Sequence, residues 1–420
     1  MVRFESNRKF SISRAFPRKL PRMIEISKAL KIVDRETAIL AAEKVALPDT
    51  VGRVLRENIV ADTALPPFDR SQMDGYAMIA ADTKGAPVTL SLIGESAAGR
   101  GWHKTLNRGE AVRIMTGAPV PKGADSVQKI ELTRESANGS VKILEPTEKT
   151  RFIVRKGAEV KKGTVVFETS EVITDSMIAS LASFGYAKVK VGKQPEVAIL
   201  GTGSEIVDIN KKPGRDQIRN SNSVMLDVLC RKFGASTTVL PITKDEISNL
   251  KYEIRNTVKK ADILIITGGV SVGKYDHTKT ALTKLGAEIY FDKVRLKPGK
   301  PAVFGRLRKT LIFGLPGNPV SAAVTFHLFV RKAILKMQGA RVTDATKGIA
   351  VLGADSKGAR ERDTYLPSLL DTNSSGQLVA HPMRWHGSSD FIGFSRADSL
   401  VFVPRGETIS KGETASFIYL

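Results

Sequence analysis

The sequence of 420 residues is longer than one compact core usually requires, so we expect two to four domains. A composition of 42% hydrophobic and 26% charged residues is typical of globular proteins, and no apolar run approaches the roughly 18 residues of a transmembrane helix. The single cysteine, Cys230, excludes an intrachain disulfide and fits a reducing, cytoplasmic compartment, with a buried core thiol favoured over a nucleophile.

The formal net charge of +22 admits nucleic acid, an anionic membrane surface or small anions as partners. Residues 1–22 hold seven Lys and Arg and one Glu, which accounts for +6 of this charge. The rest is spread along the chain without a dense basic helix or interleaved aromatic residues, which favours small anions over nucleic acid or membrane. Residues 1–22 lack the apolar core of a secretory signal, and we interpret them as a disordered basic extension.

The first part of the chain is predicted to be a mixed domain that is interrupted by a β-rich one. Apolar residues at i, i+4 and i+7 predict an amphipathic helix from Met23 to Val33, and a second short helix is expected near residues 49–55. Short β-type runs separated by turns then predict an inserted β-rich domain over 61–151. A helix over 174–184, with Thr174 as its N-cap, completes a discontinuous N-terminal domain of 23–60 plus 152–193.

Residues 194–340 alternate between strands and helices, which predicts a mostly parallel sheet with helices on both faces. The expected strands are Val197–Leu200, Ile263–Thr267 and Thr310–Phe313. The expected helices cover 223–233, 245–259, 278–285 and 319–338. Residues 341–420 return to short strands, so the fold class is multidomain α/β with a C-terminal β domain.

Each of the three predicted strands ends in a glycine-rich loop. Ligands of an open parallel sheet bind at the carboxyl ends of its strands, where glycine lets backbone N–H groups approach an anion closely. We therefore predict a site for phosphate or a similar oxyanion. A P-loop and a complete dinucleotide fingerprint are both missing from these loops. The loops are Gly201–Glu205, Thr267–Gly273 and Gly314–Pro319.

Two further segments carry charge or turn signals. Lys293–Pro301 places four cations in a frame that Pro298 and Pro301 stiffen, which favours oxyanion binding over a merely solvated strand edge. Pro66–Met78 contains the turn pair Asp74-Gly75 but is too long for a simple hairpin.

The order and spacing of these segments closely resemble the molybdopterin molybdenumtransferase family, which includes bacterial MoeA and the E domain of gephyrin. The resemblance covers residues 23–420 and rests on the motifs PPFDRSQMDGYA, RIMTGAPVPKGAD, GTGSE, ITGGVSVGKYDHTK, KPGKP and GLPGNPVSA. It implies insertion of molybdenum from molybdate into adenylylated molybdopterin, with Mg²⁺ and release of AMP. It further implies a homodimer whose site lies between the α/β domain of one subunit and the inserted β domain of the other, and other proteins of cofactor biosynthesis as possible partners.

The resemblance also implies roles for individual residues. Asp74, Glu159, Lys293 and Lys297 would act in catalysis, and Asp74 and Glu205 would bind the metal. The residues implied to hold the pterin substrate or the oxyanion are Gly201, Thr202, Gly203, Gly268, Gly269, Ser271, Gly273, Asp276, Pro298, Lys300, Pro316, Gly317, Asn318, Arg362 and Ser388.

Three departures from the family pattern make the site less negative. Ala158-Glu159 stands for Glu-Asp, Arg219-Asn220 for Tyr-Asp, and Lys274 for an acid. They suggest weakened metal coordination or a more anionic ligand. The alternatives are tungstate in place of molybdate, a diverged paralogue, a scaffold and a nucleic-acid binder. The scaffold is disfavoured because the chain lacks the additional fused domains.

Overall fold

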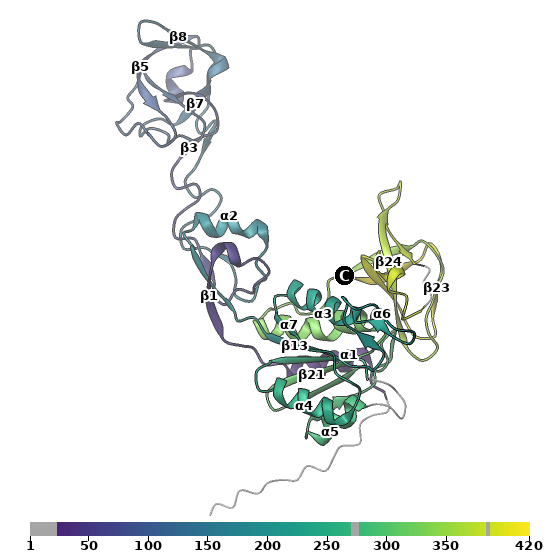
Figure 1. Cartoon of the computed structure of the whole chain (residues 1–420). Helices are drawn as coiled ribbons and strands as arrows, with labels where there is room; N and C mark the ends of the chain where they lie inside the picture. Colours follow the sequence, from purple (N-terminus) through teal and green to yellow (C-terminus); the bar gives the residue numbers. More distant parts are fainter. Residues whose placement is uncertain (1–22, 270–276, 384–386) are drawn as a thin grey trace, which may run out of the picture.

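The computed structural model describes residues 23–269, 277–383 and 387–420. The molecule is elongated: a β-rich unit stands at one end, a small mixed unit follows, and an α/β unit carries the C-terminal β unit at the other end (Figure 1). Among the described residues, no helix combines the length and the apolar character that crossing a membrane requires.

The small mixed unit is built from the chain on both sides of the insertion. β1 (Ala42–Ala46) pairs antiparallel with β12 (Lys188–Gly192), and β2 (Ile59–Val60) pairs with β11 (Val165–Phe167). Helix α2 (Asp175–Ser183) covers them, as predicted for residues 174–184. The shared core consists chiefly of Leu47, Leu55, Ile59, Ile173, Met177, Leu181, Val189 and Val191.

The short helix expected near residues 49–55 is wrong. A 3₁₀ turn, η1 (Leu47–Asp49), occupies the start of this stretch, and Gly52 then adopts a left-handed φ of 80° that a helix does not tolerate. Val54 and Leu55 instead bridge to other strands and are fully buried. Pairing with Val172 and Val191 overrides the local helical pattern.

The inserted unit is a six-stranded sheet in the order β7-β4-β6-β5-β9-β8. A two-stranded ribbon connects this unit to the rest of the chain. In the ribbon, β3 (Arg70–Ser71) pairs antiparallel with β10 (Ile153–Val154). The sheet strands are β4 (Gly75–Met78), β5 (Val88–Ser96), β6 (Glu110–Ile114), β7 (Ser126–Lys129), β8 (Thr133–Ser136) and β9 (Ser140–Ile143), with the 3₁₀ turns η2 (Ala80–Thr83) and η3 (Ile130–Leu132) between them.

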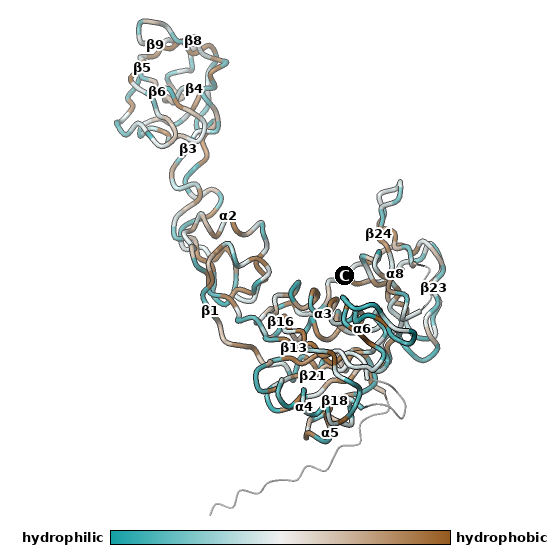
Figure 2. Tube along the Cα trace, viewed as in Figure 1, coloured by the Kyte–Doolittle hydropathy of each residue, from teal (hydrophilic) through white to brown (hydrophobic). Residues whose placement is uncertain are grey.

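The central unit has a six-stranded sheet in the order β16-β13-β17-β21-β20-β18. The first four strands run parallel, β20 runs opposite to them, and β18 pairs antiparallel with β20, which confirms the mostly parallel sheet. Figure 2 shows that hydrophobic residues gather along β13 and β21. The strands are β13 (Glu196–Gly201), β16 (Ser236–Val239), β17 (Ile263–Thr267), β18 (Glu288–Phe291), β20 (Val303–Leu307) and β21 (Thr310–Leu315).

Helices cover both faces of this sheet. β17 shows how: Ile263 and Ile265 face one core, whereas Leu264 and Ile266 face the other. Helices α4 (Ile247–Thr257) and α5 (His277–Lys284) cover the second core. Those covering the first are α1 (Ile26–Glu36), α3 (Ser221–Lys232), α6 (Pro319–Thr325) and α7 (Arg331–Gln338), the last closed by Gly339 in a left-handed conformation.

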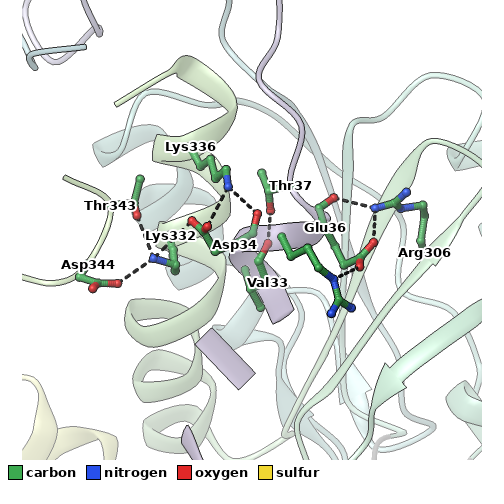
Figure 3. A network of polar contacts seen from close by, with 10 residues as sticks. Val33, Asp34, Glu36, Thr37, Arg306, Lys332, Lys336, Thr343 and Asp344 are labelled. Atoms are coloured by element: carbon green, nitrogen blue, oxygen red, sulfur yellow. Dashed lines mark hydrogen bonds and ion pairs between the residues drawn. The ribbon is translucent and has the colours of Figure 1, made fainter. Parts of the chain in front are cut away.

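Helix α1 packs on the central unit even though it precedes the mixed unit in sequence. Its buried face belongs to the core beneath α7. Polar contacts fix the other side: Lys336 binds Asp34 at 2.9 Å, and Arg306 binds Glu36 at 2.6 Å. Figure 3 shows these pairs, and next to them Lys332 donates to Asp344. The chain therefore leaves the central unit, builds the two distal units and returns.

One buried histidine should make the central unit sensitive to acid. His327 lies in the π-helical segment η4 (Phe326–Val330) between α6 and α7, where Phe233 and Phe326 contact it edge-on. Burial, reinforced by the charges of Lys232 and Arg331, lowers the pKa of His327 to about 3. The unfolded chain binds a proton below pH about 6.5. His327 therefore stabilises the fold above that pH, and its contribution is lost as the pH falls toward 3.

We expect this loss to amount to about 1.4 kcal/mol per pH unit in that window. The measurement is the free energy of unfolding of wild type and His327→Phe between pH 6 and 4. Wild type should lose stability relative to the variant as the pH falls. A difference that stays constant across the window would contradict the prediction.

The C-terminal unit is a six-stranded sheet in the order β19-β24-β25-β22-β28-β26, closed by an additional pairing of β24 with β26. One strand, β19 (Leu296–Lys297), comes from the central unit and pairs parallel with β24 (Asp363–Thr372). The other elements are β22 (Lys347–Leu352), β25 (Leu378–Pro382), β26 (Ser399–Val403), β28 (Thr414–Tyr419), the pair β23 (Ser356–Lys357) and β27 (Thr408–Ile409), and helix α8 (Phe391–Phe394).

Candidate active site

The three glycine-rich loops meet at one edge of the central sheet, because β13, β17 and β21 are neighbouring parallel strands. The Thr202 amide donates to the Thr267 carbonyl at 2.9 Å. The Asn222 amide group of α3 donates to Thr267 Oγ1 at 2.9 Å and to the Gly317 carbonyl at 2.8 Å. One side chain thus holds the second and third loops together.

Gly268 is required by space as well as by conformation. Its φ is +92°, and a Cβ placed there would lie 2.0 Å from the Thr202 carbonyl oxygen. Gly286 offers a matched control, since its φ is +81° and a Cβ there would meet nothing within 4 Å.

We expect Gly286→Ala to cost about 1 kcal/mol from backbone strain alone. Gly268→Ala should cost at least about 2–3 kcal/mol, because the first and second loops must also separate. Urea unfolding of the two variants, monitored by circular dichroism, checks the difference. Equal losses of stability in the two variants would show that the first and second loops accommodate the added methyl group without separating.

A cleft of about 690 Å³ lies beside these loops. Residues of all three loops line it, together with residues of the segment 213–222 and with Ser389 and Phe391 of the C-terminal unit. Its lining includes Thr202, Glu205, Gly268, Gly317, Asn318, Arg219, Asn220, Asn222 and Phe391. Backbone amides, small side chains and one exposed aromatic ring suit a ligand with both a phosphate and a flat ring system.

Ser388 of the C-terminal unit lies next to Ser389, which lines this cleft. Asn318 Nδ2 donates to Ser388 Oγ at 2.7 Å, and the Val320 amide donates to the Ser388 carbonyl at 3.2 Å. The first turn of α6 is therefore tied to the loop that carries Ser388. This contact brings together two of the residues that the sequence predicted for the site.

Asp245 is a candidate site residue that the sequence interpretation missed. It precedes α4, and the Thr202 hydroxyl donates to its Oδ1 at 3.4 Å. Burial raises the pKa of Asp245, and the negative charge of Glu205 raises it further, while the charge of His277 and the Thr202 hydrogen bond lower it. The Glu205 carboxylate itself folds against Gly203, where a Cβ would meet it at 2.5 Å. Only the position of Asp245 at the end of the β16 connection could have signalled it.

The predicted cationic segment lies along α6 and the edge of the C-terminal sheet. Pro298 and Gly299 are buried, and a Cβ on Gly299 would meet Thr325 of α6 at 2.7 Å. Lys297 is exposed, and Lys293, Lys300 and Arg362 are half-buried. Within the described part of the chain, none of these four cations forms an ion pair or a side-chain hydrogen bond.

Arg295, in the same segment, behaves differently. Its Nε lies 3.1 Å from Glu25, and that carboxylate also binds Arg405 at 2.8 Å. Arg295 and Arg405 thus share one structural acid, Glu25. The contrast marks the four unneutralised cations as the ones available to an anionic ligand.

Asp74 and Glu159 lie in and beside the inserted unit, far from the glycine-rich loops of the same chain (Figure 1). Asp74 Oδ1 accepts a hydrogen bond from the Thr116 amide at 2.7 Å. Glu159 is exposed and lies 3.5 Å from Arg70. One chain alone therefore does not bring these two acids to the loops.

The departures from the family pattern receive partial structural explanations. Asn220 caps α3, its Oδ1 accepting from the Ser223 amide at 3.2 Å. Arg219 donates to the carbonyls of Ile209 and Lys211 and so holds its own loop. Both replacements therefore also serve the fold. Ser271, Gly273, Lys274 and Asp276 lie outside the described residues.

The fold defines a multidomain α/β protein whose candidate site is a cleft at the carboxyl ends of the parallel strands. Three family models match consecutive parts of the chain: MoeA N-terminal region (domain I and II) at 24–185, probable molybdopterin binding domain at 198–336, and MoeA C-terminal region (domain IV) at 350–420.

Individual relatives match over nearly the whole length. The molybdopterin molybdenumtransferase of Staphylococcus aureus strain COL is 34% identical over 400 residues, 94% of this chain and 95% of its own. That of Bacillus subtilis strain 168 is 35% identical over 373 residues, 87% and 86% of the two chains. The crystal structure of the molybdopterin biosynthesis moeA protein from Pyrococcus horikoshii OT3 has a TM-score of 0.81 at 29% identity and covers 95% and 100%. The chain belongs to the molybdopterin molybdenumtransferase family, and it is an enzyme of molybdenum cofactor biosynthesis.

Proposed function

We propose that this enzyme inserts molybdenum from molybdate into adenylylated molybdopterin and releases AMP. The observation that carries the proposal is the set of unneutralised cations, Lys293, Lys297, Lys300 and Arg362, in and next to the paired strands β19 and β24 and beside α6, the helix that follows the third glycine-rich loop. Molybdate is a dianion and the second substrate carries a pyrophosphate, so their approach needs fixed positive charge. Names of the relatives support the same reaction class.

The two groups of donors suit different parts of the substrates. Backbone amides around Gly201–Gly203, Gly268–Gly269 and Pro316–Asn318 suit the phosphates, whose oxygens accept several hydrogen bonds from a converging nest. Lys297, Lys300 and Arg362 suit molybdate, with Pro298 and Ser388 shaping the site. Lys293 adds charge where the two anions meet. Fixed donors of this kind stabilise developing negative charge without reorganising.

The carboxylates fit a Mg²⁺ ion that is held together with substrate phosphates. Among the described residues no three His, Cys, Asp or Glu side chains gather as a complete metal site. Glu205 and Asp245 nevertheless lie close enough for the charge of one to raise the pKa of the other. Mg²⁺ commonly takes one or two carboxylates and completes its shell with phosphate and water. Bound there, it would neutralise the leaving phosphate of AMP.

We propose a homodimer as the working form, in the cytoplasm. Asp74 and Glu159 belong to the implied catalytic set but are remote from the loops of their own chain, so a second subunit would have to supply them. Asp74 would then act on the phosphoanhydride or bind the metal, and Glu159 would lie beside it.

The test is insertion by purified protein, with AMP release and molybdenum content of the product both measured. Adenylylated molybdopterin, molybdate and varied Mg²⁺ should yield one AMP per molybdenum inserted. Absence of both products at every Mg²⁺ level would refute the proposal and favour a diverged paralogue. Tungstate is the second candidate substrate, because its size and charge nearly match those of molybdate; competition between the two oxyanions identifies the preferred one.

A further inference from the structure

The cleft beside the glycine-rich loops has an arginine in its wall. Among the described residues that line this cleft, the only charged side chains are Glu205 and Arg219. The rest of the described lining consists of backbone groups, hydroxyls, carboxamides and apolar side chains. The unneutralised cations of the β19 and β24 region are not part of this described lining: Lys293, Lys297, Lys300 and Arg362. The charge balance of the described cleft therefore depends on Arg219.

Strand pairing holds Arg219 next to the first glycine-rich loop. β14 (Ile206–Val207) follows that loop directly and pairs parallel with β15 (Ile218–Arg219). The Ile218 amide donates to the carbonyl of Glu205, the last residue of the loop, at 2.8 Å. The backbone of Arg219 is therefore fixed relative to the loop that is predicted to hold phosphate.

The side chain of Arg219 is also held in place. Its Nε donates to the Ile209 carbonyl at 3.0 Å and to the Lys211 carbonyl at 3.1 Å. A guanidinium has five N–H donors, so the four on its two Nη atoms remain, and no acceptor among the described residues engages them. An exposed arginine normally loses side-chain freedom when it binds a ligand. Here the fold has already ordered the guanidinium, which lowers that cost.

The nearby acids have other partners. Asp208 Oδ1 accepts from the Asn210 amide at 2.9 Å and so stabilises the turn of its own loop. The Glu205 carboxylate folds against Gly203. In the described part of the chain, neither acid forms an ion pair with Arg219. The guanidinium thus lines the cleft with its charge unpaired.

We propose that Arg219 binds the phosphate that adenylylated molybdopterin and AMP have in common, an inference that rests on the proposed function. The amides of the glycine-rich loops supply hydrogen bonds but only partial charge, and Glu205 in the same lining repels an anion. A guanidinium compensates with two parallel N–H···O bonds to one phosphate. Arg219 stands where the family pattern has tyrosine, so we expect this contact to be a property of this chain.

Titration calorimetry of the full-length protein with AMP and with adenosine, Mg²⁺ being present throughout, tests this assignment without requiring activity. Arg219→Met should weaken AMP about tenfold, the loss of one charged hydrogen-bonded pair, and leave adenosine within about twofold. Arg219→Lys keeps the charge but not the planar fork and should weaken AMP about threefold. Lys212→Met is the matched control: Lys212 is an exposed cation of the same loop outside the described lining, and both affinities should stay unchanged.

The salt dependence of AMP binding separates a charge contact from a merely structural role of Arg219. The affinity of the wild type for AMP should fall as NaCl is raised from about 50 to about 500 mM, and that of Arg219→Met should fall less. Unchanged AMP affinity in Arg219→Met, an equal loss for adenosine, the same salt dependence in both proteins, or no AMP binding to the wild type would each overturn the assignment. A wild type that binds AMP through Arg219 but inserts no molybdenum would refute the proposed function alone.

Discussion

Replacing Lys297 by methionine is expected to lower the rate of molybdenum insertion at subsaturating molybdate by about 30- to 1,000-fold, which corresponds to about 2–4 kcal/mol for one charged donor to an oxyanion. Lys297 is exposed on β19 and has no ionic partner among the described residues. Methionine retains most of the apolar stem, so the loss should report charge rather than packing. The measurement is the initial rate of AMP release across a molybdate titration.

Lys309→Met provides the control for Lys297. Lys309 is also an exposed cation but lies in the turn between β20 and β21. It should leave the rate within about twofold, as surface substitutions away from a site usually do. Equal rates for the two variants would show that Lys297 contributes nothing beyond the general positive field. If saturating molybdate restores the rate, Lys297 acts in binding that anion.

Combining Asp74→Asn with Lys297→Met in separate subunits is expected to restore activity that each variant lacks alone. If the site is shared between subunits, a hybrid dimer contains one site with both substitutions and one with neither. Random mixing makes about half of the dimers hybrids, and half of the sites in each are intact, so about a quarter of wild-type activity should return. The experiment is refolding or co-expression of the two variants, followed by the insertion assay.

The matching control carries both substitutions on the same chain and is mixed with wild type. In these hybrids each of the two shared sites carries one of the two substitutions, so neither site is intact. Activity should come from wild-type dimers, again about a quarter of the total. Failure of the separately substituted subunits to recover any activity, although hybrids are shown to form, would place the site within one chain.

Much of the central unit follows from the sequence because its pattern is strong and local. The apolar run Ile263–Thr267 is β17 residue for residue, and Pro319 begins α6 as its fixed φ predicts. Parallel order then brings three glycine-rich loops together without further information. The fold class and the family were predictable for this reason.

Other features depend on contacts between distant segments. The residues near 49–55 have a helical pattern, but long-range pairing with Val172 and Val191 decides their structure. Helix α1 was predictable, whereas its packing beneath α7 depends on side chains roughly 300 positions later. Asp245 lacked any motif, and its raised pKa arises from burial beside Glu205. Such neighbours become visible only in three dimensions.

Strand β19 belongs to the central unit but pairs into the C-terminal sheet, so Lys297 on this strand connects the two units. Because β19 is paired with β24, a rotation of the C-terminal unit must either carry Lys297 with it or break that pairing. Arg362 immediately precedes β24 and would move in the same way. Closing on molybdate would therefore fix the angle between two domains. A crosslink from β24 to the central unit would set the affinity for the anion from outside the site.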